Sequence, residues 1–220
     1  RPLWHALTTR HADLGDGGAR ARRYRASIAS FASTIDDGAA SRAELAALMI
    51  PDETYLTLQA SPVVPPAGFD VPMAAPGVQM TIETAPPAMD EAQIERLTWD
   101  DAQAMLDLAE LTKPGPFTLK SQSLGNFWGV RENGALVAMA GERMKVPGLT
   151  ELSGVCTHPS AQGRGLARRL SVYVTRQIFA RGEKSFLHAW TTNTTAIRLY
   201  ESIGFRHRRD MYIAAVHRPA

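Results

Sequence analysis

A short glycine-containing segment ahead of a basic helix is the part of this sequence best suited to hold a ligand. It reads HPSAQGRGLARRL from His158 to Leu170, with glycine at 163 and 165. Glycine permits positive φ and lets a ligand approach the backbone closely. A helix start also offers unpaired N–H groups and the positive end of the helix dipole. The segment therefore predicts an anion site, and phosphate is the usual occupant of such a site.

Two familiar phosphate-binding loops do not match this segment. No Gly-Lys-Ser/Thr follows the glycines, which excludes a Walker A loop. Gly163 and Gly165 could begin a dinucleotide fingerprint, but Arg168 stands where its third glycine belongs.

The pattern that does match is Q/R-x-x-G-x-G/A, carried by Gln162 to Ala167. A second pattern follows it, N-x-x-A-x-x-L-Y-x-x-x-G-F, carried by Asn193, Ala196, Leu199, Tyr200, Gly204 and Phe205. With these two motifs, residues 92–220 resemble the GNAT superfamily of N-acetyltransferases. The resemblance implies acetyl-CoA as cosubstrate and no metal.

The resemblance also implies which residues contact coenzyme A. In the family, the strand before the loop splays away from its neighbour and its free backbone groups pair with the pantetheine arm, while the loop amides bind the pyrophosphate. The implied contacts are Val155, Cys156, Thr157, Gln162, Gly163, Arg164, Gly165, Leu166, Ala167, Arg168 and Asn193. We expect Cys156, the single cysteine, to act as a small apolar residue rather than in the chemistry.

Amine acetylation needs a base for the ammonium and an acid for the departing thiolate. Tyr200 matches the family's general-acid position. Glu151 matches a position that a base glutamate occupies in some members, Glu142 on the preceding strand is a second candidate, and a water chain would also serve. His188 alternates with Phe186 and Trp190 on a strand; we expect a structural histidine there, with substrate contact as the alternative.

The second part of the chain supplies the elements that must position these residues. Hydrophobic periodicity and turn residues predict a mixed α/β sheet, antiparallel early and parallel around the glycine motif. The expected strands are 94–98, a hairpin over 127–146 turning at Asn133-Gly134, 150–158, 185–190 and one or two over 205–216; the expected helices are 98–113, 165–182 and 193–204. A Pro-Gly-Pro break within 111–117 is a candidate wall of the acceptor pocket.

The first part of the chain carries no chemical motif. We expect a helix over 41–49, with Ser41 as N-cap and Glu44 completing a capping box, and strands over 54–60 and 77–84. Residues 61–90 are rich in proline and glycine, and the charge balance changes from acidic to basic after residue 90. We therefore expect an accessory α/β region at 1–85, which could be a degenerate half-copy of the same fold, joined near 85–92 to an acetyltransferase domain at 92–220.

Composition excludes several classes of protein. The chain has 220 residues and a formal net charge of +2, with no apolar run long enough for a membrane span and no secretory signal pattern. The basic run at 19–25 lacks the interleaved aromatics of a nucleic-acid site. An arginine- and alanine-rich composition suggests a GC-rich, bacterial genome. We expect a cytoplasmic monomer or homodimer that acetylates a primary amine of a small molecule or peptide; the alternative is a non-catalytic acyl-CoA-binding module.

Overall fold

The computed structural model describes all residues, 1–220. Its helices are α1 (Pro2–Thr8), α2 (Ala39–Leu48), α3 (Ala102–Thr112), α4 (Leu166–Ala180) and α5 (Thr194–Ile203), with 3-10 turns η1 (Ala12–Leu14), η2 (Trp99–Asp101), η3 (Ser121–Ser123) and η4 (Pro159–Ala161). Its strands are β1 (Gly15–Gly17), β2 (Ala21–Tyr24), β3 (Ala32–Thr34), β4 (Thr54–Gln59), β5 (Asp70–Ile82), β6 (Glu95–Leu97), β7 (Phe127–Glu132), β8 (Ala135–Val146), β9 (Leu149–Thr157), β10 (Lys184–Trp190) and β11 (Arg206–His217).

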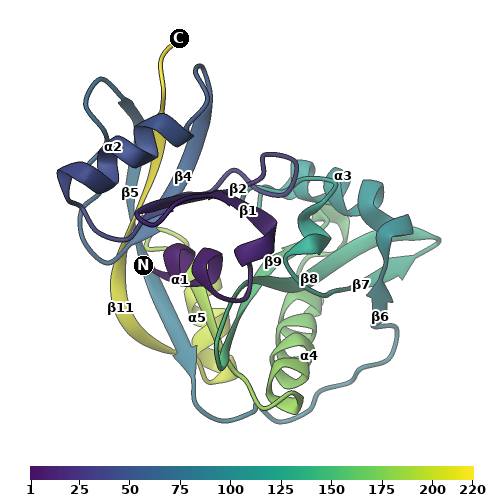
Figure 1. Cartoon of the computed structure of the whole chain (residues 1–220). Coiled ribbons are helices and arrows are strands. Elements are labelled where there is room, and N and C mark those ends of the chain that lie inside the picture. Colours follow the sequence, from purple (N-terminus) through teal and green to yellow (C-terminus); the bar gives the residue numbers. More distant parts are fainter.

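One large mixed sheet organises the molecule (Figure 1). Its eight strands follow the order β4-β11-β5-β10-β9-β8-β7-β6, and β1, β2 and β3 form a separate small sheet. Only β9 and β10 are parallel neighbours, and α4 connects them. The mixed α/β sheet, with its parallel pair around the glycine motif, is confirmed.

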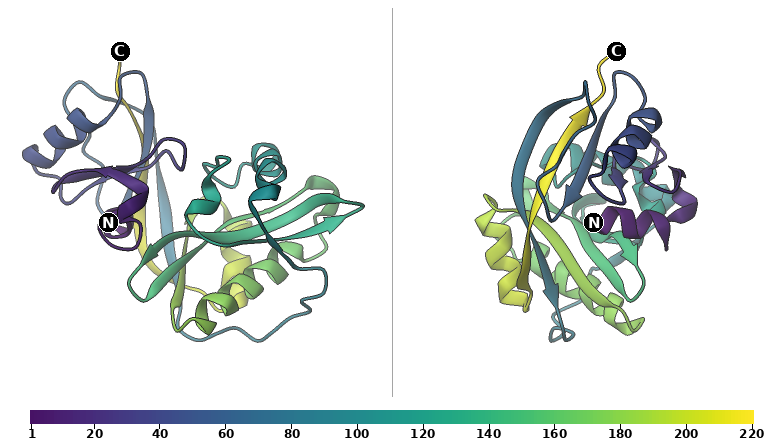
Figure 2. Two further views of the ribbon diagram at one scale, coloured as in Figure 1. Left: turned by 45° about the vertical axis from the view of Figure 1, so that its right-hand side comes forward. Right: turned by 60° about the vertical axis from the view of Figure 1, so that its left-hand side comes forward.

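The parallel pair holds together along only part of its length. Residues 184–186 of β10 pair with residues 149–151 of β9, and beyond this point the two strands separate. The sheet consequently divides into two diverging halves, with β5 and β11 (blue and yellow) in one and β7, β8 and β9 (teal to green) in the other (Figure 2). The opening between β9 and β10 is where the helix α4 begins.

Strands from the first part of the chain belong to this same sheet. β5 lies between β10 and β11, which are consecutive strands in the sequence, and β4 pairs with β11 at the sheet edge. The segment 85–92 contains no helix or strand, and it lies along α4, where Arg169 donates to the carbonyls of Asp90 and Ala92 and Arg176 donates to that of Pro86. This arrangement argues against a boundary at which 1–85 could separate from 92–220.

Two expectations for the first part of the chain need correction. β5 begins at Asp70, inside a segment that we expected to be irregular. This segment can form a strand despite its prolines because residues 70–76 pair in a ladder with β11 alone, and prolines are tolerated on such a free edge. The helix α2 has Gly38 as its N-cap, and Ser41 lies inside the helix, donating to Asp36. Glu44 accepts hydrogen bonds from the N–H groups of Arg20 and Ala21 instead of closing a capping box.

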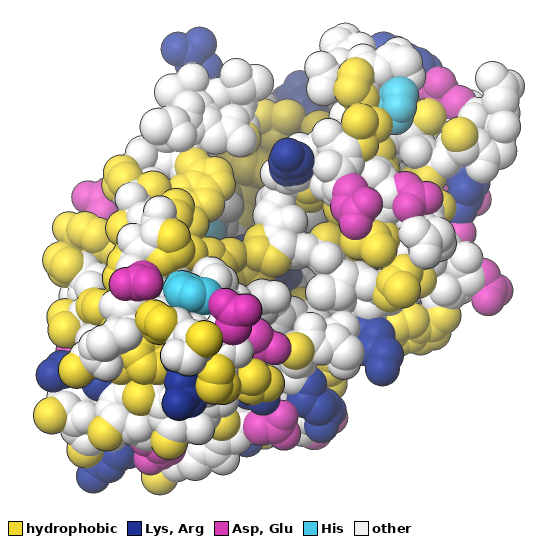
Figure 3. All heavy atoms as spheres, turned by 90° about the horizontal axis from the view of Figure 1, so that it is seen from above, with side chains coloured by type: hydrophobic (Ala, Val, Ile, Leu, Met, Phe, Trp, Pro, Cys, Tyr) yellow, Lys and Arg dark blue, Asp and Glu magenta, His cyan; other side chains and the backbone are white.

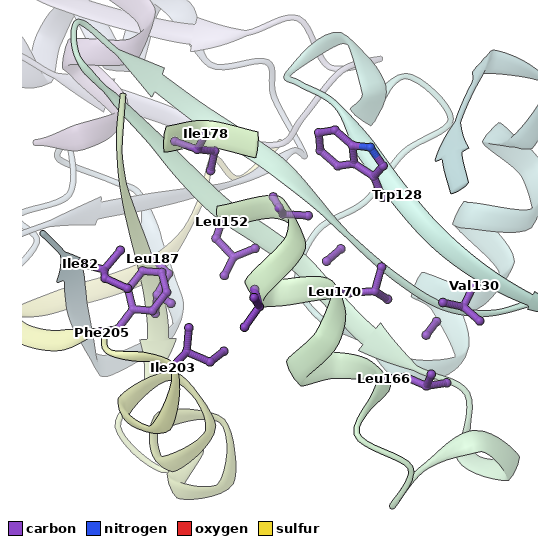
Figure 4. Close-up of a cluster of buried hydrophobic side chains, with 14 of the residues drawn as sticks. Ile82, Trp128, Val130, Leu152, Leu166, Leu170, Ile178, Leu187, Ile203 and Phe205 are labelled. Carbon is purple, nitrogen blue, oxygen red and sulfur yellow. The ribbon is translucent and has the colours of Figure 1, made fainter. Parts of the chain in front are cut away.

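The later elements follow the sequence pattern closely. Thr98 caps η2 in a capping box with Asp101, and Asn133 and Gly134 take positive φ in the hairpin turn. The helix α4 packs its apolar side against the sheet, and the buried side chains include Leu166, Leu170 and Ile178 (Figure 4). This packing fixes the start of α4 beside the opening of the sheet.

Candidate active site

A cleft of about 630 Å³ lies where the two halves of the sheet separate. It is lined by the glycine loop and the start of α4, by the ends of β9 and β10, by α5, and by residues of β4, β8, β11 and the 112–116 turn. Figure 3 looks down into a hollow between two parts of the molecule, with hydrophobic side chains on its walls. A residue that contacts a bound substrate or cosubstrate here must therefore line this cleft.

The glycine loop presents free backbone donors to the cleft. Gly163 and Gly165 have φ of 76° and 75°, and nothing lies within 4 Å of a Cβ added at either position. The N–H groups from Gly163 to Arg168 donate to no other backbone group, and the first such bond of α4 runs from Arg169 to Gly165. The loop therefore fits a phosphate group, because convergent N–H donors stand at a helix N-terminus with open space in front of them.

Most of the expected coenzyme A contacts line this cleft. Gln162, Gly163, Gly165, Leu166, Ala167 and Arg168 do so, as do Val155, Cys156, Thr157 and Asn193. Asn193 also caps α5, accepting a hydrogen bond from the N–H of Ala196 at 3.1 Å. Arg164 is the exception, since it turns outward and forms an ion pair with Glu132.

Cys156 and Tyr200 line the cleft as protonated groups. Burial raises the pKa of the Cys156 thiol to about 11. Burial, with the nearby charge of Glu151, raises the pKa of Tyr200 to about 12. At neutral pH the Tyr200 hydroxyl therefore keeps its proton and can donate it.

Glu151 is fully buried and does not line the cleft. Its carboxylate accepts two hydrogen bonds from Arg143, each of 2.8 Å, and one from the N–H of Met144 at 3.2 Å. Burial alone would raise the pKa of Glu151, but the charge and hydrogen bonds of Arg143, with a hydrogen bond to His188, lower it to about 2. Glu151 is thus a permanently charged partner for its neighbours rather than a group that meets a substrate.

His188 is the neighbour that reaches the cleft. Its Nδ1 lies 2.7 Å from Glu151 Oε1, and its Nε2 lies 3.0 Å from Gln79 Nε2. Gln79 Oε1 accepts from Arg208 at 2.6 Å, so the amide nitrogen of Gln79 is a donor toward His188. His188 consequently donates from Nδ1 to Glu151 and carries its lone pair on Nε2.

The sequence gives one signal for His188, its alternation with Phe186 and Trp190 along a strand. This signal does not reveal the contact with Glu151. That contact depends on the pairing of β9 with β10, which brings together residues 37 positions apart. The His188 side chain is 3% exposed and both of its ring nitrogens have partners, as expected of a structural histidine, and it also forms part of the cleft wall.

Glu142, the second base candidate, lies away from the cleft. It is fully buried, and it forms ion pairs with Lys145 at 2.7 Å and with Arg181 at 2.6 Å, beside the C-terminal end of α4. Adjacent strand positions point to opposite faces of a sheet, so Glu142 and its neighbour Arg143 have different surroundings. Both of its cationic partners are outside the cleft lining.

Comparisons with known proteins identify the family of this chain. Residues 127–214 match the family model described as FR47-like protein. The chain is 35% identical over 149 residues to N-alpha-acetyltransferase RimI of Mycobacterium tuberculosis (strain ATCC 25618 / H37Rv), covering 60% of this chain and 89% of that protein.

Solved structures give a longer match. A putative acetyltransferase of the GNAT family from Novosphingobium aromaticivorans is 39% identical with a TM-score of 0.94, covering 100% of this chain and 98% of that one. An acetyltransferase of the GNAT family from Colwellia psychrerythraea, 16% identical with a TM-score of 0.54 over 69% of this chain and 57% of that one, shares the fold.

The fold and these relatives define an acyltransferase. The chain belongs to the GNAT superfamily of N-acetyltransferases, whose members use acetyl-CoA as cosubstrate. No helix is long and apolar enough to cross a membrane. No group of three or more histidine, cysteine or acidic residues is arranged to hold a metal ion.

Proposed function

We propose that this protein transfers an acetyl group from acetyl-CoA to a primary amine by direct attack within a ternary complex. The observation that carries the proposal is the shared cleft: free loop amides, a protonated tyrosine and a histidine whose Nε2 is a hydrogen-bond acceptor all line it. Ten of the eleven expected cofactor contacts lie there as well. The loop amides bind the pyrophosphate, and Arg168 adds positive charge beside them.

His188 is the base in this proposal, and Glu151 positions it. The carboxylate holds Nδ1–H and stabilises the imidazolium that forms when Nε2 takes a proton. Gln79 donates to Nε2 in the structure, and in this proposal the acceptor ammonium takes the place of the Gln79 amide. Arg143 keeps Glu151 ionised. The contacts therefore lead from the buried Arg143–Glu151 ion pair to His188 in the wall of the cleft.

The transfer balances with one proton accepted and one supplied. The acceptor ammonium loses a proton to His188 Nε2, and the amine nitrogen bonds to the thioester carbonyl carbon. The carbon–sulfur bond then breaks, and Tyr200 donates its hydroxyl proton to the leaving thiolate. Of the two protons left on the nitrogen, one leaves to solvent and one stays on the amide product, and proton exchange through water returns Tyr200 and His188 to their starting states.

Release of free thiol from acetyl-CoA, screened against amines, amino acids and peptides, tests this function. Binding of acetyl-CoA should be measured by calorimetry beside it. Acetyl-CoA binding without thiol release for any amine would favour the non-catalytic module, and absence of binding would reject the cofactor site.

A further inference from the structure

The end of the cleft away from the glycine loop differs in chemistry from the cofactor end. The walls of this end come from the loop that precedes β3, from β4, β8 and β11, and from the 112–116 turn. Phe31, Leu56 and Ile213 supply apolar surface, and all three pack with the cluster of buried side chains under α1. This end is where an acceptor has to enter if coenzyme A fills the other.

No aspartate or glutamate side chain lines the cleft, whereas Lys113, Arg143 and Arg168 do. A cleft that binds polycationic amines needs carboxylates on its walls to balance the charge. Glu151, the carboxylate that holds Arg143 and His188, is fully buried and already has these partners. The walls therefore disfavour polyamines, aminoglycosides and lysine-rich peptides.

Arg143 has one donor group to spare. Its Nε and Nη2 are bound to Glu151, while Nη1 has no hydrogen-bond partner in the protein. Nη1 lies 3.8 Å from the place of a Cβ at Gly115, in the Pro-Gly-Pro turn, and the guanidinium carbon lies 5.2 Å from the centre of the Phe31 ring. Arg143 is thus held rigidly by Glu151 and Phe31, with a donor facing the turn that carries Lys113.

From this arrangement we infer that the acceptor is a free α-amino acid with an apolar side chain. The side chain lies on Phe31, Leu56 and Ile213. The carboxylate meets Arg143 Nη1 and Lys113, and the ammonium displaces the Gln79 amide from His188 Nε2. A zwitterion matches a wall in which Arg143 and His188 flank one buried carboxylate, because Arg143 and Lys113 offer cations to its carboxylate and His188 offers an acceptor to its ammonium. This inference rests on the proposed acetyl transfer.

Thiol release with the full chain and a matched set of leucine derivatives tests the inference. We expect kcat/KM for leucine to exceed that for leucinamide, a leucyl peptide and 3-methylbutylamine by about tenfold or more, because only leucine carries a carboxylate on the same carbon as the ammonium. Spermidine should be the poorest acceptor. A higher kcat/KM for the peptide, the alkylamine or spermidine than for leucine would overturn the inference.

Two pairs of variants separate the contacts from general damage. Ile213→Glu should lower kcat/KM for leucine about tenfold or more, mainly through KM, whereas Ile35→Glu, at an isoleucine that is 45% exposed and outside the cleft, should not. Lys113→Glu should lower kcat/KM for leucine but not for 3-methylbutylamine, with Lys120→Glu as its control. Equal losses for leucine and 3-methylbutylamine in Lys113→Glu, or wild-type kinetics in both cleft variants, would contradict the assignment.

The inference and the proposed function fail in different ways. If acetyl-CoA does not bind, the proposed function is rejected and the inference with it. If acetyl-CoA binds and a cationic amine or a peptide is the best acceptor, only the amino-acid inference is rejected.

Discussion

The two ends of the cleft are built from the chain in different ways. At the cofactor end, one continuous segment from Val155 to Arg168 supplies a strand end, a loop and a helix start. At the acceptor end, Phe31, Leu56, Arg143 and Ile213 come from segments that are far apart in the sequence. The first end is a local structure, and the second exists only after the sheet has assembled.

This difference has a functional consequence. A local loop keeps its geometry when the rest of the cleft changes, so it suits a cosubstrate that all members of the superfamily share. The acceptor end is assembled from β4, β8, β11 and the 112–116 turn, so substitutions in any of these elements can change its shape.

The largest effect is expected at the cofactor end. Gly165→Glu places a carboxylate among the phosphates and crowds the loop amides, so calorimetry should show acetyl-CoA binding weakened by about 10²-fold or more. Gly182→Glu is the matched control, because Gly182 also has positive φ, 78°, and open space around it, at the other end of α4. Equal affinities in the two variants would remove the phosphate site from the glycine loop.

Tyr200 lines the cleft from α5, and its loss should slow the chemistry alone. Tyr200→Phe keeps the ring, which packs 6.0 Å from that of Phe205, so the melting temperature and acetyl-CoA affinity should change little. The kcat should fall by about 10²-fold, the usual scale for a positioned acid. Tyr173→Phe, on α4 beside Trp128, is the control. A kcat in Tyr200→Phe equal to that of the wild type across pH would leave the thiolate departing unaided.

The two buried glutamates should behave differently in kinetics. Both Glu142 and Glu151 are fully buried and ion-paired, so Glu142→Gln and Glu151→Gln should each lower the free energy of unfolding by about 3–5 kcal/mol. Only Glu151→Gln should also change the pH profile of kcat/KM, because only Glu151 holds His188. A changed profile in Glu142→Gln alone would reverse the assignment.

Glu151 should also affect stability in acid. Its pKa falls from an ordinary 4.5 to about 2 in the folded protein. A carboxyl with a lowered folded pKa stabilises the fold fully above its unfolded pKa and loses that contribution as the pH falls toward the folded pKa. The difference in melting temperature between the wild type and Glu151→Gln should therefore be largest above about pH 5 and shrink toward pH 2. A constant difference across that range would mean that the ion pair with Arg143 contributes nothing.

How much the sequence predicts follows the same contrast between local and assembled structure. The loop, the helices α4 and α5 and the Asn133-Gly134 hairpin depend on neighbouring residues, and their patterns predict them. The contact of His188 with Glu151 depends on the register of β9 and β10, which no motif encodes. The prolines of β5 suggested a loop because the sequence does not reveal that this part of the strand has a neighbour on one side only.

The smallest effect is expected from limited proteolysis, which tests whether the two parts of the chain can be separated. Loss of residues 1–85 would remove β5 from between β10 and β11 and leave long edges of both strands unpaired. It would also remove Phe31 and Leu56 from the acceptor end. We therefore expect no stable fragment near 92–220: after a cut within 61–68 or 85–92, the pieces should stay associated in gel filtration and keep acetyl-CoA binding. A folded 92–220 fragment that binds acetyl-CoA by itself would show that the cofactor end needs none of the earlier strands. Residues 85–92 would then be a true domain boundary.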